Sequence, residues 1–303
     1  MSPRASTRTT QSRPGHRLLF GLWLDALTLD EVVSRCEAVV RARGRLLVGV
    51  VNAAKVVHLR QDPVLRASLL EADVLLADGQ SVVWASRLLR RPLPERVAGI
   101  DLFERLLAVA DTHGHRVYLL GAKPEVLREL VARIGQRWPH LVVAGQRDGY
   151  FADEDGAEVA AQIAASGADM LFLGMVSPKK ENFLARHGAD LGVPVLHGVG
   201  GSFDVLAGTV RRAPVRWQRL GMEWAYRLVQ EPRRLWKRYL VTNTSFALLT
   251  LRELVRPSPP FEATGRVGPG VAPTPPPAPA PSPAPTAAPR SLSAGPTRGQ
   301  THG

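Results

Sequence analysis

The sequence predicts an α/β protein with a Rossmann-like, mostly parallel sheet covered by helices on both faces. Short apolar runs bounded by turn residues recur along the chain, at 45–51, 73–78, 115–121, 140–145, 169–175 and 193–200. Helical patterns lie between these runs, for example at 101–113, 124–137, 153–166 and 178–190. Strands that are apolar on both faces and alternate with helices are typical of a parallel sheet buried between two helical layers.

The two ends of the chain differ in composition from this central part. Residues 1–15 lack apolar periodicity, and the chain after residue 255 is rich in Pro, Ala, Ser and Thr. Such segments cannot bury enough apolar surface to offset the entropy lost on ordering. We therefore expect disordered tails at 1–15 and 256–303, an α/β core at 16–209 and a helical appendage at 210–255.

The first helix should begin after Thr28, because Thr28 and Glu31 have the spacing of a capping box. The apolar run before it, 18–29, is interrupted by Asp25 and is followed by no small-residue cleavage site. It therefore predicts neither a membrane-spanning helix nor a signal peptide. The single cysteine, Cys36, excludes an intrachain disulfide and a cysteine-based metal cluster, which fits a cytoplasmic protein.

Candidate site residues follow the predicted strands, because ligands bind at the carboxyl ends of strands in such sheets. These positions are Asn52, "DGQS" at 78–81, "GAKPE" at 121–125, "GMVSPKKE" at 174–181 and "GVGGSFD" at 198–204. Asp78 would serve either as a general base or as a plain helix N-cap. The sequence position alone leaves both open.

Two of these segments have ordinary explanations as well as functional ones. "GVGGSFD" resembles a glycine-rich phosphate loop, but it follows the last strand and lacks the acidic residue of a dinucleotide fingerprint. "SPKKE" is explained by Ser177 as N-cap and Pro178 as the first helical residue, with Lys179 and Lys180 in solvent.

The formal net charge of +12 is concentrated near the end of the predicted ordered part. Residues 211–238 contain nine Arg or Lys against Glu223 and Glu231, an excess of nine minus two, or seven. Such a patch favours the phosphates of nucleic acid, anionic lipid or a phosphorylated substrate.

Large apolar side chains accompany these charges at helical spacing. The stripe consists of Trp217, Leu220, Trp224 and Leu228, beside Arg212, Arg216, Arg219 and Arg227, and Pro232 restarts the pattern in a second helix. One interpretation is a basic helical hairpin packed on the core. The other is an interfacial helix on an anionic membrane surface.

Several segments together resemble a known family. They include "VNAAKVV", "ADGQSVVWAS", "RVAGIDLFERLL", "LFLGMVSPKKENFL" and the long block "GVGGSFDVLAGTVRRAPVRWQRLGMEWAYRLVQEPRRLWKRYL". In order and spacing they are similar to the WecG/TagA/CpsF family of bacterial glycosyltransferases, over about residues 17–243. The resemblance implies inverting transfer of a sugar from a UDP-sugar donor to a polyprenyl-diphosphate-linked sugar, with no metal ion and no cofactor. The sugar would be N-acetylmannosamine, its uronic acid or a related hexose, and the acceptor lipid-linked N-acetylglucosamine.

The resemblance also assigns roles to individual residues. Asp78 matches the proposed catalytic base, and Arg227, Arg234 and Lys237 match basic residues that the appendage brings over the site. Asn52, Arg96, Tyr150 and Asp204 match pocket positions. The sequence departs from the family at Val50, where some members have threonine, and at Lys180, where glutamine is common. Lys180 would favour an acidic sugar or would point outward as an ordinary lysine.

The implied partners are the donor, the lipid-linked acceptor and an anionic membrane surface at the inner face of the plasma membrane, with self-association also expected. Two other classes of function fit the sequence less well. A nucleic-acid-binding module is disfavoured because neither a helix-turn-helix nor an RNA-binding motif is found, so no nucleic-acid partner is expected. A nucleotide-dependent oxidoreductase would reveal itself by nicotinamide or flavin absorbance.

Overall fold

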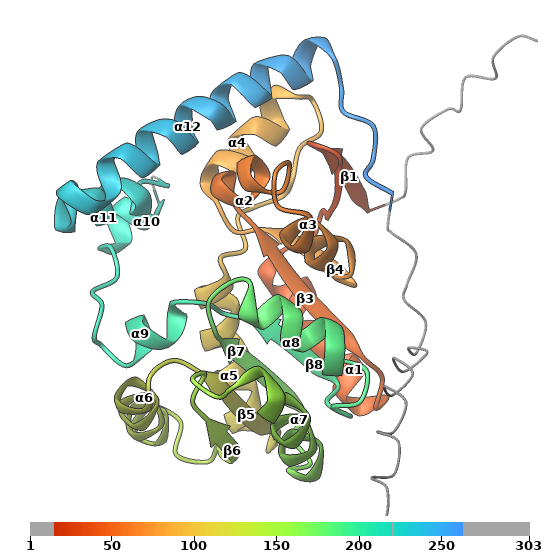
Figure 1. The fold of residues 1–303 in the computed structure, drawn as a ribbon, viewed down its shortest axis with the longest axis vertical. Helices are drawn as coiled ribbons and strands as arrows, with labels where there is room; N and C mark the ends of the chain where they lie inside the picture. Colours follow the sequence, from red (N-terminus) through yellow and green to blue (C-terminus); the bar gives the residue numbers. More distant parts are fainter. Residues whose placement is uncertain (1–14, 220, 263–303) are drawn as a thin grey trace, which may run out of the picture. The chain divides into compact units, whose positions relative to one another are not determined.

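The computed structural model describes residues 15–219 and 221–262. Most of the two predicted tails and Leu220 of the apolar stripe lie outside this range. The predicted fold class is confirmed: a six-stranded parallel sheet lies between helices on both faces (Figure 1). The strand order is β4-β3-β8-β7-β5-β6.

The strands of the main sheet coincide closely with the predicted apolar runs. They are β3 (Leu46–Val51), β4 (Val74–Ala77), β5 (Arg116–Gly121), β6 (Val142–Arg147), β7 (Met170–Gly174) and β8 (Val195–Gly198). Four of them, β3, β4, β7 and β8, are almost wholly buried, as expected for strands covered on both faces. The edge strand β6 is partly exposed and contains Gly145, Gln146 and Arg147, which explains why its end was predicted too early.

Helices on one face of the sheet share a single apolar cluster. They are α1 (Leu29–Arg41), α5 (Gly99–His113), α6 (Pro124–Arg137) and α9 (Ser202–Leu206). The capping box at the start of α1 is confirmed, because the Thr28 hydroxyl accepts from the Glu31 N–H and the Glu31 carboxylate accepts from the Thr28 N–H. Phe103, Phe172 and Phe203 join α5, β7 and α9 in this cluster.

The opposite face carries two further apolar clusters. One includes α7 (Gly156–Ala165), which a short 3-10 turn, η1 (Asp153–Asp155), precedes, and α8 (Lys179–His187). The other includes α2 (Ala53–His58), α3 (Pro63–Leu70) and α4 (Gln80–Leu88).

An antiparallel hairpin precedes the sheet, formed by β1 (His16–Leu19) and β2 (Leu22–Asp25). This is the early apolar run of the sequence. The hairpin packs with α2, α3 and α4, and the Asp25 carboxylate accepts a hydrogen bond from the Leu75 N–H in β4. Asp25, which interrupts the apolar run in the sequence, therefore joins the hairpin to the sheet through this hydrogen bond.

The C-terminal segment forms three helices: α10 (Val215–Arg219), α11 (Glu223–Gln230) and α12 (Pro232–Val255). Pro232 is the first residue of α12, as predicted. The later half of α12 lies along α2 (Figure 1). Phe246 of α12 is buried, and its ring packs against Phe20 of the hairpin. Among the described helices, none combines the length and apolarity needed to span a bilayer.

Candidate functional site

Asp78 directly follows β4 at the carboxyl edge of the sheet, and its carboxylate is held from two sides. Oδ1 accepts from the N–H of Gly99 at 2.9 Å, and Oδ2 accepts from Nδ2 of Asn52 at 3.4 Å. Asp78 does not cap α4, whose N-cap is Gly79. The plain N-cap interpretation is therefore wrong for the helix that follows Asp78, although its carboxylate does satisfy the first N–H of α5.

The contact with α5 has an electrostatic consequence. Gly99 is the first residue of this 15-residue helix, whose N-terminus carries a partial positive charge. The Asp78 carboxylate therefore faces the partial positive charge at the start of α5. Its side chain is held in one orientation and is only partly buried.

Asn52 occupies the corresponding place after β3. Its side-chain oxygen accepts from the Lys55 N–H at 3.1 Å and caps α2, while its amide nitrogen is free to donate to Asp78. Because β3 and β4 are neighbours in the sheet, these two predicted residues are brought together.

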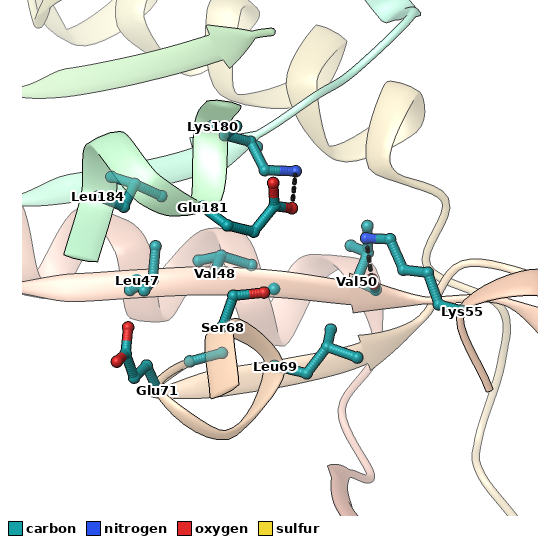
Figure 2. A pocket seen from close by; sticks show the side chains of 13 residues that line it. Leu47, Val48, Val50, Lys55, Ser68, Leu69, Glu71, Lys180, Glu181 and Leu184 are labelled. Carbon is teal, nitrogen blue, oxygen red and sulfur yellow. Dashed lines mark hydrogen bonds and ion pairs between the residues drawn. The ribbon is translucent and has the colours of Figure 1, made fainter. Parts of the chain in front are cut away.

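A cavity of about 40 Å³ lies between β3, α3 and α8, and Lys55, three residues after Asn52, is among its lining residues. That volume holds only a few water molecules. Lys55 reaches into it and donates from Nζ to the Val50 carbonyl at 2.7 Å (Figure 2). Desolvation by burial and the nearby Lys180 ammonium lower the pKa of Lys55 to about 8, and Asp78 and Glu181 offset only part of this effect.

Lys180 enters the same cavity from α8. Its side chain is 14% exposed, and Nζ lies 3.1 Å from the Glu181 carboxylate. Its aliphatic part packs over Gly198, at the end of β8. The prediction of a solvated, outward-facing Lys180 is therefore wrong. Figure 2 shows the Lys180–Glu181 pair on α8 above β3.

The start of α8 also differs from the prediction. Pro178 occupies the N-cap position, and α8 begins at Lys179. The Ser177 hydroxyl donates to the Glu181 carboxylate at 2.9 Å instead of capping the helix. Lys179 is not simply solvated either, because its ammonium donates to the Phe151 carbonyl and lies 4.1 Å from the centroid of the Phe151 ring. The Ser-Pro segment thus positions Glu181 in the cavity.

His197 lies fully buried in β8, below the same group of side chains. Its ring nitrogens are 3.2 Å from the carbonyls of Val48 and Gly99, so it bridges β3 and α5. Burial lowers the pKa of His197, which keeps the ring neutral despite its two carbonyl neighbours. His197 therefore fixes the N-terminus of α5 relative to the sheet. Because Gly99 is the first residue of α5, this also holds Gly99 against Asp78.

The loops after β5 and β7 diverge at the carboxyl edge. Gly121 ends β5 with φ 131° and lies directly against Gly174 of β7, so a side chain at Gly121 would collide with the Gly174 backbone. After β5 the chain continues into α6 on one face of the sheet. After β7 it continues into α8 on the other face. Such a divergence is where open α/β sheets bind their ligands.

Tyr150 and Asp204 lie near this divergence. The chain after β6 turns back over the end of β5, where the Gly149 N–H donates to the Ala122 carbonyl, and leaves Tyr150 70% exposed. Asp204 lies in the first turn of α9, partly buried, and among the described residues its carboxylate has no hydrogen bond or ion pair.

Several polar groups of the "GVGGSFD" loop already form hydrogen bonds within the fold. Two of its N–H groups, those of Val199 and Gly200, donate to the Leu173 carbonyl, at 3.0 and 3.3 Å. The Ser202 hydroxyl donates to the Val199 carbonyl. The loop therefore has fewer free donors than the resemblance to a phosphate loop suggested.

Arg96 connects the core with the appendage. Its guanidinium lies 2.8 Å from Glu223 of α11 and 3.4 Å from Asp101 of α5. Arg212 bonds the same Asp101 and lies 3.6 Å from Glu223. Two arginines and two acids thus form a closed network at the start of the appendage.

The predicted basic residues of the appendage are placed apart from Asp78. Arg227 on α11 and Lys237 on α12 are exposed, and no contact joins either to Asp78 within the described residues. Arg234 lies on α12, and its side chain is outside the described part. Lys237 lies 5.5 Å from the centroid of the Trp236 ring.

A comparison with known protein families finds a match over most of the chain. A model of the glycosyl transferase WecG/TagA/CpsF family matches residues 17–259. The chain belongs to this family. The WecG/TagA/CpsF match includes the hairpin, the whole sheet and all three appendage helices. It makes the protein a glycosyltransferase of cell-surface polysaccharide synthesis, with a sugar-nucleotide donor and a lipid-linked acceptor.

The sequence pattern assigned no role to Lys55 and Glu181, which line the cavity, or to His197, which is buried in β8. His197 stands inside an apolar strand run, and Lys55 stands three residues after a strand-end Asn. A charged or titratable residue in an apolar context is a usable signal, because such residues are rarely buried without a partner. Val50, the predicted departure, is 8% exposed and packs toward Gly99.

Proposed function

We propose that the protein is an inverting, metal-independent hexosyltransferase acting on lipid-linked N-acetylglucosamine. A hydroxyl of the acceptor sugar attacks the anomeric carbon of a UDP-sugar from the face opposite UDP. The new glycosidic bond forms as the bond to the UDP oxygen breaks, UDP leaves with the electron pair, and the hydroxyl proton passes to Asp78. The transferred sugar is N-acetylmannosamine, its uronic acid or a related hexose.

The position of Asp78 is the observation that supports this mechanism best. A general base must be ionised, oriented and close to the attacking hydroxyl. The Gly99 N–H and the Asn52 amide orient the carboxylate. Asn52 is also placed to donate to a sugar hydroxyl beside it.

The departing UDP requires positive charge near its phosphates. Arg227, Arg234 and Lys237 supply it in this proposal, and they belong to the segment with an excess of seven positive charges. Because Arg227 and Lys237 are exposed and not in contact with Asp78, the appendage would have to move toward the sheet edge on substrate binding. The Arg96–Glu223 ion pair joins the appendage to the core, so this movement would have to break or rearrange it.

The remaining pocket residues would bind the two sugars. In this proposal Arg96, Tyr150 and Asp204 contact the sugars, and the Asp204 carboxylate, which has no hydrogen bond or ion pair among the described residues, accepts from sugar hydroxyls. Lys180 is paired with Glu181, so much of its charge is already neutralised. This pairing favours a neutral N-acetylhexosamine over a uronic acid as donor sugar.

The appendage would also dock on an anionic membrane, where the lipid-linked acceptor resides. One face of α12 is buried at Leu235, Phe246 and Thr250, and Phe246 belongs to an apolar cluster of the core. The opposite face exposes an apolar stripe at spacings of three, four and eight residues, made of Trp236, Leu240, Leu248, Leu251 and Val255. Arg233 and Lys237 lie on the same side at its start, the arrangement of an interfacial helix on anionic lipid.

The decisive experiment measures transfer from a panel of UDP-sugars, neutral and uronic, to a short-chain polyprenyl-diphosphate N-acetylglucosamine. Wild type is compared with Asp78→Asn and with the double variant Arg227→Ala/Lys237→Ala. Asp190→Asn and Arg137→Ala, at exposed positions outside the proposed site, serve as matched controls. Deletion of the appendage is unsuitable, because it would also remove Phe246 from the apolar cluster.

We expect transfer by wild type and both controls, with large losses in Asp78→Asn and in the double variant. No transfer by wild type from any donor would overturn the proposed acceptor. Full activity in Asp78→Asn would move the base to another residue.

A further inference from the structure

A cluster of potential metal ligands lies far from the carboxyl edge of the sheet. It consists of Glu37 on α1, His113 at the end of α5 and His115 just before β5. One ligand atom from each residue lies within 4.8 Å of the others. β5 has six residues, or about 20 Å, so the cluster and the edge that carries Asp78 are at opposite ends of the strands.

Local structure explains why the three side chains meet. α5 ends at His113, and Gly114 follows with φ 70°, the left-handed conformation that closes many helices. The His115 N–H donates back to the Ala110 carbonyl at 3.0 Å, so the turn is tight and the two imidazole centroids are 5.8 Å apart. Because α1 packs against α5, Glu37 faces this turn.

The cluster is incompletely bonded as it stands. The Glu37 carboxylate lies 2.8 Å from Nδ1 of His113. Nε2 of His115, however, is buried and has no hydrogen-bond partner among the described residues. A buried polar atom without a partner is costly, and native proteins rarely keep one without a reason.

The charges around the cluster also suit a cation. Glu37 supplies a carboxylate, and its side chain is only 17% exposed. The Asp169 carboxylate, near enough to act on His115, adds negative charge, and the Arg41 cation opposes it.

We propose that Glu37, His113 and His115 form a binding site for Zn²⁺ or a similar divalent transition metal ion. Two imidazoles and one carboxylate are a common zinc ligand set, and a water completes the tetrahedron. Tetrahedral ligands about 2.1 Å from zinc are about 3.4 Å from one another. The ligand atoms lie within 4.8 Å of one another, so metal binding would require them to move closer together, and the half-exposed His113 side chain has room to move.

The bound ion would clamp α1 to the turn between α5 and β5 and so stabilise the fold. It takes no part in sugar transfer, because it lies at the other end of the strands from Asp78. The expectation of a metal-free transfer reaction is therefore unaffected, and this site stands or falls independently of the proposed function.

The test uses the full chain without a polyhistidine tag, freed of metal with a chelator. Co²⁺ is titrated and the visible d–d absorption recorded, and Zn²⁺ binding is followed by the rise in Tm. We expect one ion per chain, tetrahedral Co²⁺ bands and a Tm rise of several degrees with excess Zn²⁺.

Three variants decide the assignment. His113→Gln and His115→Gln should each weaken binding at least about 10-fold and remove most of the Tm rise, while His140→Gln, at an exposed histidine outside the cluster, should bind as wild type does. His113 is half exposed, so its variant should fold even if His115→Gln does not. Absence of Co²⁺ bands in wild type, or equal affinity in wild type and His113→Gln, would overturn the proposal.

Discussion

The carboxyl edge of the sheet and the outer face of the appendage differ in how their side chains are partnered. At the sheet edge, Asp78, Asn52 and Lys55 each bond to a group from another turn or strand. On the appendage, Trp236, Leu240 and Lys237 are exposed, although they are large or charged. The first region is organised before any ligand arrives.

The difference indicates where each region finds its partners. A preorganised carboxylate needs no reorganisation when the reaction occurs, which is what catalysis requires. Exposed apolar and basic side chains on one helix face are satisfied only by something outside the chain. Four measurements would test this difference between the sheet edge and the appendage, from the largest expected effect to the smallest.

The largest effect is expected at the preorganised edge. Asp78→Asn keeps an acceptor for the Gly99 N–H but removes the basic carboxylate, so kcat/KM should fall about 10²–10⁴-fold with Tm almost unchanged. Steady-state transfer assays and thermal unfolding measure the two quantities. A fall in Tm parallel to the loss of activity would show that Asp78 is structural.

The two faces of α12 should respond differently to substitution. Phe246→Ala should lower the free energy of unfolding by about 3–5 kcal/mol, because its buried ring packs against Phe20. Trp236→Ala, at a side chain 49% exposed, should cost within about 0.5 kcal/mol but weaken binding to vesicles containing anionic lipid. Chemical denaturation and vesicle co-sedimentation provide the readouts. Equal vesicle binding by wild type and Trp236→Ala would remove this face from the membrane proposal.

Lys55 should make stability depend on alkaline pH. Its pKa is about 8 in the folded chain against 10.5 as reference, so the unfolded chain binds more protons between these values. Below pH 8 the buried Lys55 ammonium lowers the free energy of unfolding by its full amount. This destabilisation disappears as pH rises to 10.5 and Lys55 loses its proton. Relative to Lys55→Met, the free energy of unfolding of wild type should rise by roughly 2–3 kcal/mol across this window. Urea unfolding at several pH values measures it, and parallel pH profiles would contradict the burial.

The smallest effect is expected where the two regions meet. A double-mutant cycle on Arg96 and Glu223 should give a coupling free energy of about 1 kcal/mol, because Arg96 is only 13% exposed. The exposed pair Arg133 and Glu129 is the matched control, with about 0.3–0.5 kcal/mol expected. Denaturant unfolding of the four proteins in each cycle supplies the values. If the two couplings are equal, Arg96 does not hold the appendage to the core.

Much of the sheet could be predicted because its strands are buried on both faces and stand out as apolar runs. Asp78 and Asn52 could be located for the same reason, since they are the first polar residues after β4 and β3. The hairpin could not, because its apolar run is short and Asp25 looks like an interruption until its bond to the Leu75 N–H is seen.

The polar interior of the site was also beyond sequence reasoning. Lys180 looks like a solvated lysine in "SPKKE", and only the approach of α8 to Gly198 places it in the cavity with Lys55. Similarly, the sequence does not show that Glu37 lies beside His113 and His115, because only the packing of α1 on α5 brings the three residues together. Contacts between distant segments decide such clusters, and one sequence contains no direct record of them.

Residues beyond α12 bear on how a shortened chain should be expressed. The Phe261 N–H donates to the Gly21 carbonyl in the turn of the hairpin, and its ring lies against that glycine and near the Arg66 guanidinium. A fragment cut at residue 259, where the family match ends, would lose this cover and expose the hairpin turn. A fragment that ends at residue 262 keeps this contact between Phe261 and the hairpin, and it is only three residues longer.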